Sequence, residues 1–566
     1  MVDFKKEIVM ILKKEIDSLD ESEIKSMIEV PPNSDMGDYA FPCFKLAKTF
    51  RKAPPLIAKD IIDNIQDNDL FEKIEQAGAY INFFVDKTIF IKQTLKEVLE
   101  KKELYGSSNM GEGKNVIVEF SSPNIAKPFH IGHIRSTVIG NSIHKIYKFL
   151  GFNTITINHL GDYGTQFGKL IVAFKKWGNE EEVKENPIPT LLKLYVKFHD
   201  EAEKDPSLED EGREWFKKLE DGDEEAFKLW KWFREVSLDE FNRVYKMLDI
   251  TFDSFAGESF YSDKMGRVLN MMEEKNILEE SQGAQIVSLD EYDMPPALIK
   301  KNDGSTLYIT RDITAAIYRK ETYDFYKNIY VVASQQNLHF QQLIKILEIM
   351  GFEWANDCVH VPFGLVSLEE GTIATRKGRV VFLEDVLRQA VEKTREIIKE
   401  KNPNLKNLDQ VAHDVGVGAV VFQELSNNRI KDYTFSWDQV LNFEGETGPY
   451  VQYTYARANS VIKRSSIEID SEFNAELLND DIIIEVIKKI EEFPNSIKEA
   501  QGKNEPSIIT RHIVNLAQEF NRFYHNYPVL VDDVELQKAR LAVVYAVKEV
   551  IGIGLSLLGM KAPEEM

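Results

Sequence analysis

Cysteine is scarce in this chain, which carries only Cys43 and Cys358 among its 566 residues. Two cysteines so far apart argue against a disulfide framework and against a Cys-rich zinc site. Long apolar runs are also missing. Residues 1–19 alternate charged and apolar side chains as an amphipathic helix does, without the continuous apolar core of a secretion signal. Residues 541–560 are interrupted by Lys548 and Glu549, which predicts a packed helix. We therefore expect a cytoplasmic protein with no membrane partner.

Positive charge is in deficit as well, since 70 basic residues face 93 acidic ones and the net charge is −23. Such a chain repels polyanions on average, so any nucleic-acid site must be a local basic surface. Residues 447–467 contain no acidic side chain, and they supply Tyr450, Tyr453, Tyr455, Arg457, Lys463 and Arg464. Aromatic planes and cations of this kind suit RNA. An ordinary helix with a tyrosine-lined core face and solvated cations fits the same pattern, and both interpretations stay open.

The most informative motif is His130-Ile131-Gly132-His133, which lies between an apolar strand and a helix. The pattern predicts a strand over 115–121, a helix over 134–150 that stops at Gly151, and a second strand over 154–157. These three elements form a βαβ unit. The amino end of its helix offers backbone N–H groups and a positive dipole end to an anion such as a phosphate.

The two histidines share one face of the first helical turn, so both rings can donate hydrogen bonds to one triphosphate. Gly132 between them has no Cβ, so a flat ring can lie against the backbone there. A zinc-binding His-x-x-His pair and a satisfied core histidine are the alternatives for this short motif.

A longer run of sequence resembles one enzyme family. Residues 119–133 and the segment Asn158-His-Leu-Gly-Asp162 with its continuation to Gly168 are similar to class I aminoacyl-tRNA synthetases, and within them to arginyl-tRNA synthetases. The resemblance implies a multidomain α/β protein. It implies an N-terminal α+β domain that contacts the tRNA elbow (1–105), a Rossmann-type class I catalytic domain (106–400) and a helical, all-α anticodon-binding bundle (401–566). The catalytic domain carries a helical insertion at about 180–280.

The same resemblance implies an arginine pocket. Arginine is a permanent planar cation, so a selective site presents carboxylates to its guanidinium group. The segment Asp303-Gly-Ser-Thr-Leu-Tyr-Ile-Thr-Arg-Asp312 resembles the family motif that supplies Tyr308 and Asp312 to the guanidinium, with Glu258 as a second acceptor. The α-amino end is expected to contact Glu119, Asn124 and Gln336. Each carboxylate taken alone is more typical of a surface charge.

The chain departs from the class pattern at the second ATP signature, which aligns as Thr372-Ile-Ala-Thr-Arg376 followed by Lys377 and lacks the leading lysine. Adenylate formation places negative charge on pyrophosphate and requires a positive partner. The family implies that Lys127, just before the histidine motif, supplies it, with Arg376 and Lys377 as rivals. The expected ATP-binding residues are Lys127, His130, Gly132, His133, Arg376 and Lys377, of which Lys127, His130 and His133 are the expected catalytic residues.

The resemblance therefore implies an arginine-tRNA ligase that uses ATP, Mg²⁺ and L-arginine to form arginyl-adenylate and then charges tRNA(Arg). The family suggests that tRNA must bind before the adenylate forms, and we expect a monomer with no resident metal ion. Two alternatives are a sister synthetase such as the cysteinyl type, whose zinc-ligating cysteines are lacking here, and a non-catalytic tRNA-binding paralogue. The retained His130, Gly132 and His133 argue against the paralogue.

Overall fold

The computed structural model describes residues 4–66, 68–127, 129–302, 308–368 and 381–566. These residues form two compact units. Unit one comprises residues 4–105, 457–493 and 515–551, and unit two comprises residues 106–456, 494–514 and 552–566, apart from the positions outside the described ranges.

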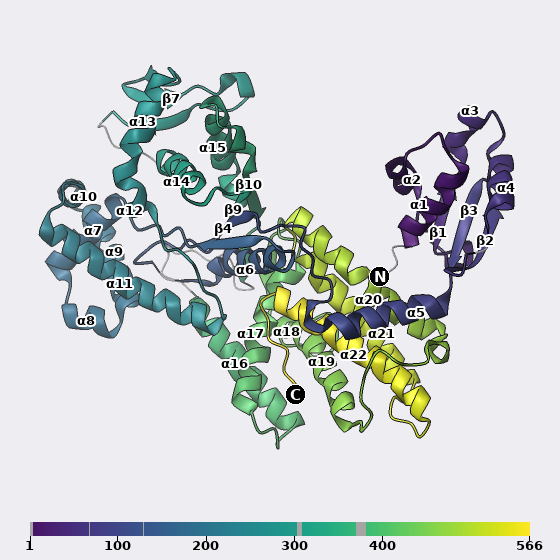
Figure 1. Cartoon of the computed structure of the whole chain (residues 1–566). Helices are drawn as coiled ribbons and strands as arrows, with labels where there is room; N and C mark the ends of the chain where they lie inside the picture. Colours follow the sequence, from purple (N-terminus) through teal and green to yellow (C-terminus); the bar gives the residue numbers. More distant parts are fainter. Residues whose placement is uncertain (1–3, 67, 128, 303–307, 369–380) are drawn as a thin grey trace. The chain divides into compact units, whose positions relative to one another are not determined.

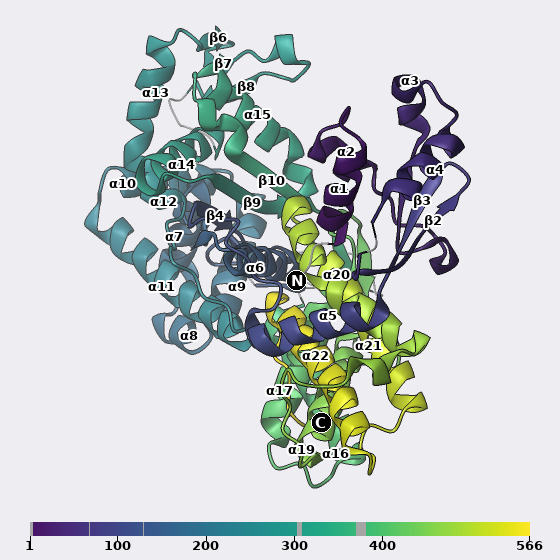
Figure 2. The ribbon, with the colours of Figure 1, turned by 45° about the vertical axis from the view of Figure 1, so that its right-hand side comes forward.

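The N-terminal part of unit one is an α+β layer. Strands β1 (Tyr39–Pro42), β3 (Tyr80–Val85) and β2 (Phe71–Ala77) form an antiparallel sheet in the order β1-β3-β2. Its helices are α1 (Phe4–Glu15), α2 (Glu21–Met27), α3 (Ala47–Phe50), α4 (Pro54–Asn64) and α5 (Lys87–Lys101) (Figure 2). Apolar residues of α1, α2 and α4 share one core with the sheet. The amphipathic helix expected near the N-terminus is therefore confirmed as α1.

Unit two is built on a parallel sheet in the order β10-β9-β4-β5, comprising β4 (Asn115–Glu119), β5 (Asn153–Ile157), β9 (Lys327–Ala333) and β10 (Cys358–Phe363). Helix α6 (Ile134–Phe149) connects β4 to β5, so the predicted βαβ unit is confirmed. It lies on the side of the sheet opposite α14 (Tyr308–Tyr323) (Figure 1). The expectation that the first strand runs to Ser121 is wrong. Ser121 and Ser122 have φ of 69° and 47°, which extended backbone cannot adopt.

The long stretch between β5 and β9 contains most of the other helices of unit two and a second, smaller sheet. Between β5 and β6 the chain carries α7 (Thr165–Trp177), α8 (Glu180–Glu185), α9 (Pro187–Ala202), α10 (Ser207–Glu220), α11 (Glu224–Met247), α12 (Glu258–Tyr261) and α13 (Met265–Glu274). A small antiparallel sheet follows, with β6 (Glu279–Ser281), β7 (Ala284–Val287) and β8 (Ala297–Lys300). Helix α15 (Asn337–Ile349) lies between β9 and β10 in sequence.

The C-terminal region is mostly helical. Its helices are α16 (Leu383–Lys401), α17 (Leu408–Ser426), α18 (Trp437–Val440), α19 (Gly448–Arg464), α20 (Asp481–Lys503), α21 (Ser507–Asn526) and α22 (Val534–Leu557). The region 401–566, expected to be all-α, also contains one short strand, β12 (Tyr433–Phe435), which pairs in parallel with β11 (Val366–Leu368). β12 reads Tyr-Thr-Phe, three residues that favour extended structure. Among the described residues, no helix has the length and apolar character needed to cross a membrane.

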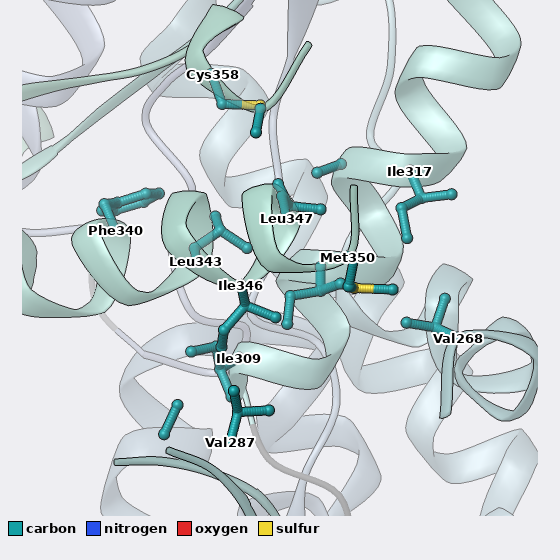
Figure 3. Close-up of a cluster of buried hydrophobic side chains, with 14 of the residues drawn as sticks. Val268, Val287, Ile309, Ile317, Phe340, Leu343, Ile346, Leu347, Met350 and Cys358 are labelled. Carbon is teal, nitrogen blue, oxygen red and sulfur yellow. The ribbon is translucent and has the colours of Figure 1, made fainter. Parts of the chain in front are cut away.

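One apolar core fixes the position of α14. Ile309, Ile313 and Ile317 of α14 recur every four residues, so they share the helix face that packs against α15 and the sheet. Figure 3 shows Ile309 near Ile346 of α15, and the same cluster includes Ile317, Leu343, Cys358 and Met350, which follows α15 directly. Cys358 is therefore a core residue, and burial raises the pKa of its thiol to about 12. The other face of α14 is left for polar residues.

Candidate active site

The loop between β4 and the histidine motif has a strained backbone. Ser121, Ser122 and Ala126 all have φ between 47° and 69°, a region that non-glycine residues rarely adopt. Side chains hold the loop in place. The Ser121 backbone N–H donates to Ser136 Oγ at 2.9 Å, and the Ala126 N–H donates to Ser237 Oγ of α11 at 3.1 Å. Strain that is enforced by buried hydrogen bonds is typical of functional loops.

His130 and His133 lie together at the start of α6, with ring centroids 3.9 Å apart. His130 Nδ1 accepts the Gly132 N–H at 3.1 Å, and His133 Nδ1 accepts the His130 N–H at 3.2 Å. Burial lowers the pKa of His130 to about 4 and that of His133 to about 3, so both rings are neutral at pH 7. A neutral imidazole that accepts at Nδ1 carries its proton on Nε2. Each ring therefore keeps one N–H donor for a ligand.

The backbone of this turn does not offer the free N–H groups that the sequence predicted. Residues 130 and 132 donate to the histidine rings, and residues 131, 133 and 134 donate to the carbonyls of Val381, His130 and Ile131. The prediction is wrong because the histidine side chains themselves cap the helix. Gly132 lies against one of these two rings. A Cβ there would lie 2.9 Å from His130 Cε1, so the ring that lies against this glycine is that of His130.

Of the three cations proposed to bind ATP, the structure describes only Lys127. Lys127 is exposed in a bend three residues before His130, and desolvation lowers the pKa of its ammonium group. Arg376 and Lys377 lie outside the described residues. Residues that flank them are anchored at the histidine motif, because Leu383 N donates to the Phe129 carbonyl at 2.9 Å and Ile131 N donates to the Val381 carbonyl at 3.1 Å.

Asp312 lies on the polar face of α14 between two imidazoles. His339 Nε2 is 2.6 Å from Asp312 Oδ2, and His159 Nε2 is 3.8 Å from Asp312 Oδ1. Burial raises the pKa of Asp312, but the hydrogen bond and charge of His339 outweigh it and leave the pKa below its usual value. Asp312 is therefore a carboxylate at neutral pH.

Glu258 begins α12 and is paired with Arg311 of α14. The distance from Arg311 Nη1 to Glu258 Oε2 is 2.8 Å, and both side chains are about nine-tenths buried. The Arg311 guanidinium carbon lies 5.2 Å from the centre of the Tyr308 ring and 5.7 Å from that of Tyr163. Burial raises the pKa of Glu258 to about 8, although the Arg311 charge opposes that rise.

Glu258 is positioned by the segment after β5. The Glu258 N–H donates to the Leu160 carbonyl at 3.0 Å, and the buried Asp162 accepts from Ser259 N and Ser259 Oγ. Asp162 also accepts from Arg234 Nε of α11 at 2.8 Å. A Cβ at Gly257 would lie 2.5 Å from the Leu160 carbonyl, so only glycine permits this approach.

Glu119 ends β4 and is paired with Arg319, whose side chain is fully buried. Arg319 Nη2 lies 2.6 Å from Glu119 Oε2 and 3.4 Å from His159 Nδ1. Arg319 is seven residues after Asp312 on the same face of α14. The structure therefore gathers Glu119, Glu258, Tyr308 and Asp312 around one helix. Asn124 and Gln336 are exposed at the ends of the loops that follow β4 and β9, and Asn124 pairs with Gly161 in an isolated bridge.

Three family profiles cover most of the chain. They are described as "Arginyl tRNA synthetase N terminal domain" for residues 5–85, "tRNA synthetases class I (R), catalytic domain" for residues 94–437 and "DALR anticodon binding domain" for residues 451–566. The chain therefore belongs to the arginyl-tRNA synthetases.

Full-length relatives agree with this membership. The arginine-tRNA ligases of Clostridioides difficile and Halothermothrix orenii are 63% and 62% identical to this arginyl-tRNA synthetase, with 100% of each chain covered. The crystal structure of arginyl-tRNA synthetase from Plasmodium falciparum is similar with a TM-score of 0.81 at 27% identity, covering 100% of this chain and 99% of that one. The expected class I fold is thereby confirmed, with a parallel-sheet catalytic domain, an N-terminal domain and a helical C-terminal domain.

Several residues of this arginyl-tRNA synthetase site were missed by sequence reasoning. They are His159, Asp162, Arg311, Arg319 and His339. The sequence could have indicated three of them. Arg311 directly precedes Asp312 in the segment 303–312, and His159 and Asp162 lie in the segment 158–162, both of which resemble the family. Among the described residues, no three His, Cys, Asp or Glu side chains gather to hold a metal ion. The zinc interpretation of His130 and His133 gains no support there.

The residues expected to bind tRNA share helix α19. Tyr453 is 41% exposed, Lys463 and Arg464 are exposed, and Tyr450 is half-buried. Arg457 is half-buried too, donates from Nη1 to Asn521 Oδ1 and lies over the Tyr524 ring. Lys463 and Arg464 thus lie on the exposed surface of this helix, whereas Arg457 already has a structural role.

Proposed function

We propose that this synthetase activates L-arginine with ATP and transfers it to the terminal ribose hydroxyl of tRNA(Arg). The observation that carries the proposal is the pair of acidic side chains, the buried Glu258 and the half-buried Asp312, beside Tyr308 at one end of α14. Two carboxylates and an aromatic ring match a planar cation with five donors. A lysine side chain would leave part of this array unpaired, which favours arginine.

In the first step a carboxylate oxygen of arginine attacks the α-phosphorus of ATP, the bond to the β-phosphate oxygen breaks, and pyrophosphate leaves. In the second step the ribose oxygen attacks the arginyl carbonyl and AMP leaves. We assign no protein nucleophile. Catalysis would consist of alignment of the two substrates and stabilisation of the developing phosphate charge.

We assign the ATP contacts to Lys127, His130, Gly132, His133, Arg376 and Lys377. The neutral rings of His130 and His133 would act as Nε2 hydrogen-bond donors, without the positive charge of an imidazolium. The cation would therefore come from Lys127, which is exposed next to the motif. Mg²⁺ fits a role as the counter-ion of the ATP phosphates, because it needs few protein ligands when phosphates supply oxygen.

We assign the arginine contacts to Glu119, Asn124, Glu258, Tyr308, Asp312 and Gln336. Glu258, Tyr308 and Asp312 would take the guanidinium. The second oxygen of Glu119, together with Asn124 and Gln336, would take the α-amino end.

We assign contact with tRNA to Tyr450, Tyr453, Arg457, Lys463 and Arg464. We also propose that the chain has three domains, at residues 1–105, 106–400 and 401–566. The description of the C-terminal family profile as an anticodon-binding domain supports an RNA role for this region. The proposal also includes a cytoplasmic monomer and a requirement for bound tRNA before arginine is activated.

ATP–pyrophosphate exchange over an amino-acid panel, with and without tRNA, tests the proposal. Exchange with arginine alone among the amino acids, and only when tRNA is present, is the expected result. Exchange with another amino acid would refute the specificity, and exchange without tRNA would refute only the tRNA requirement. No exchange under any condition, with tRNA binding retained, would identify a non-catalytic tRNA-binding protein.

A further inference from the structure

We propose that Arg311 is a positioning residue of the arginine pocket that orients Glu258, favours its ionised form and shares it with the substrate. One oxygen of Glu258 would serve Arg311 and the other would serve the substrate guanidinium. This inference rests on the proposed function, because it concerns how the arginine pocket is made ready for its ligand.

The contacts of Arg311 resemble those proposed for the substrate. Its guanidinium meets Glu258 at 2.8 Å and lies over the rings of Tyr308 and Tyr163. A carboxylate and aromatic faces are the partners that guanidinium groups prefer. Two arrangements follow from this likeness. Either Arg311 stays while the substrate binds beside it, or Arg311 blocks the pocket and must leave.

Burial favours the first arrangement. The Arg311 and Glu258 side chains are only 9% and 10% exposed. Separating a buried pair leaves an uncompensated charge, which is strongly unfavourable. Glu258 is also held from its other side, since its N–H is bound to the Leu160 carbonyl and Ser259 is bound to Asp162. The Arg311–Glu258 pair is therefore a fixed part of the pocket lining.

Charge explains what Arg311 contributes. The groups that bear on Glu258 are Asp312 and Asp162, whose negative charges oppose its ionisation, and Arg311, which favours it. The phenol of Tyr308 also lies within the influence of Glu258. Without Arg311, burial and two negative neighbours would raise the pKa of Glu258 further above about 8, so the substrate guanidinium would meet a protonated group. A protonated acid is a poor acceptor for guanidinium, so the substrate would lose one of its two carboxylates.

The test is Arg311→Ala, compared with Arg267→Ala as a matched control. Arg267 lies on α13 and forms an exposed ion pair with Glu321, which lies on α14 as Arg311 does. The Arg267 side chain is 63% exposed. We expect Arg311→Ala to raise the arginine KM at pH 7 by roughly 30-fold or more. The ATP KM should stay near that of wild type, whereas the melting temperature should fall because a buried ion pair is lost. Arg267→Ala should change none of these, since exposed pairs contribute little.

Two further readouts separate positioning from general damage. Millimolar guanidinium ion should restore arginine use in Arg311→Ala, whereas urea, which has a similar planar shape and no charge, should not. In a Glu258→Gln background, Arg311→Ala should add little to the loss, because Arg311 acts through Glu258. Arg311→Lys, which keeps the charge, should retain more activity than Arg311→Ala and serves if the alanine variant does not fold.

A lower arginine KM in Arg311→Ala would overturn the inference and identify Arg311 as a blocking side chain. An unchanged KM, or full additivity with Glu258→Gln, would also overturn it. Failure of the proposed function is a separate outcome, because it would appear in the wild-type protein as a lack of exchange with arginine.

Discussion

Asp312 and His339 meet at 2.6 Å between Oδ2 and Nε2, so the carboxylate proposed for the substrate guanidinium is already paired within the protein. An internal partner orients the carboxylate and also competes with the substrate for it. Glu119 with Arg319 and Glu258 with Arg311 repeat this arrangement. Each carboxylate of the pocket is thus fixed in place by a basic side chain, which is what pre-organised recognition requires.

Asp312→Asn should impair arginine use while tRNA binding stays near that of wild type. The change removes the negative charge that faces the guanidinium, and loss of one partner of a buried charge pair costs about 3 kcal/mol or more. We expect the kcat/KM for arginine to fall by roughly 100-fold or more, measured by pyrophosphate exchange with tRNA present. Asp324→Asn is the control, since Asp324 follows α14 and its side chain is 88% exposed. An unchanged kcat/KM would remove Asp312 from the pocket.

Arginine affinity should rise as the pH increases from about 6.5 through about 8. Burial lowers the pKa of His339, but its hydrogen bond with Asp312 outweighs this and leaves the pKa above 6.5. Protonated His339 competes with arginine for Asp312, so its deprotonation favours the substrate, whose guanidinium stays charged throughout. Glu258 acts in the same direction, because its pKa of about 8 means that it gains charge as the pH rises.

Arginine KM measured against pH in two variants separates these groups. His339→Asn should lose the inflection of His339 and keep the one near pH 8, and Glu258→Gln should lose the inflection near pH 8 and keep that of His339. Two pH profiles identical to that of wild type would show that neither group titrates in contact with the substrate.

Sequence alone predicted the βαβ unit because the strands and helix show their own local periodicity. The resemblance to a family motif placed Tyr308 and Asp312 in one pocket, and in the structure the two residues are four apart on α14 and share a helix face. The Glu258–Arg311 pair could not be predicted from spacing, because the two residues are 53 positions apart and meet only when α12 packs on α14. The self-capped histidine turn was missed for a different reason. Which nitrogen of His130 or His133 faces the backbone depends on side-chain rotation, which no sequence pattern records.

Lys127→Ala should slow adenylate formation more than it weakens ATP binding. The proposed contact forms as charge moves onto pyrophosphate, and a contact made only in the transition state lowers kcat and leaves KM almost unchanged. We expect a loss of about 10²-fold to 10³-fold in kcat for exchange. Lys114→Ala is the control, because Lys114 is paired with Glu112 on the surface of the same unit. Near-normal turnover in Lys127→Ala together with loss in Lys377→Ala would assign the cation to the second signature.

Replacement of Lys463 and Arg464 by glutamine should weaken tRNA binding and flatten its dependence on salt. Each lost phosphate contact removes a released counter-ion, so the double variant should lower the slope of log K against log salt by about 2. Both side chains are exposed, so the melting temperature should not change.

Arg457→Gln is the contrasting variant on the same helix. Arg457 donates to Asn521 and lies over Tyr524, so its loss should lower the melting temperature whether or not it contacts RNA. Binding titrations at several salt concentrations, run beside thermal melts, distinguish the two roles. An unaltered salt slope in the Lys463 and Arg464 double variant would mean that these cations are only solvated, and the RNA contact would then lie on another part of the helical domain.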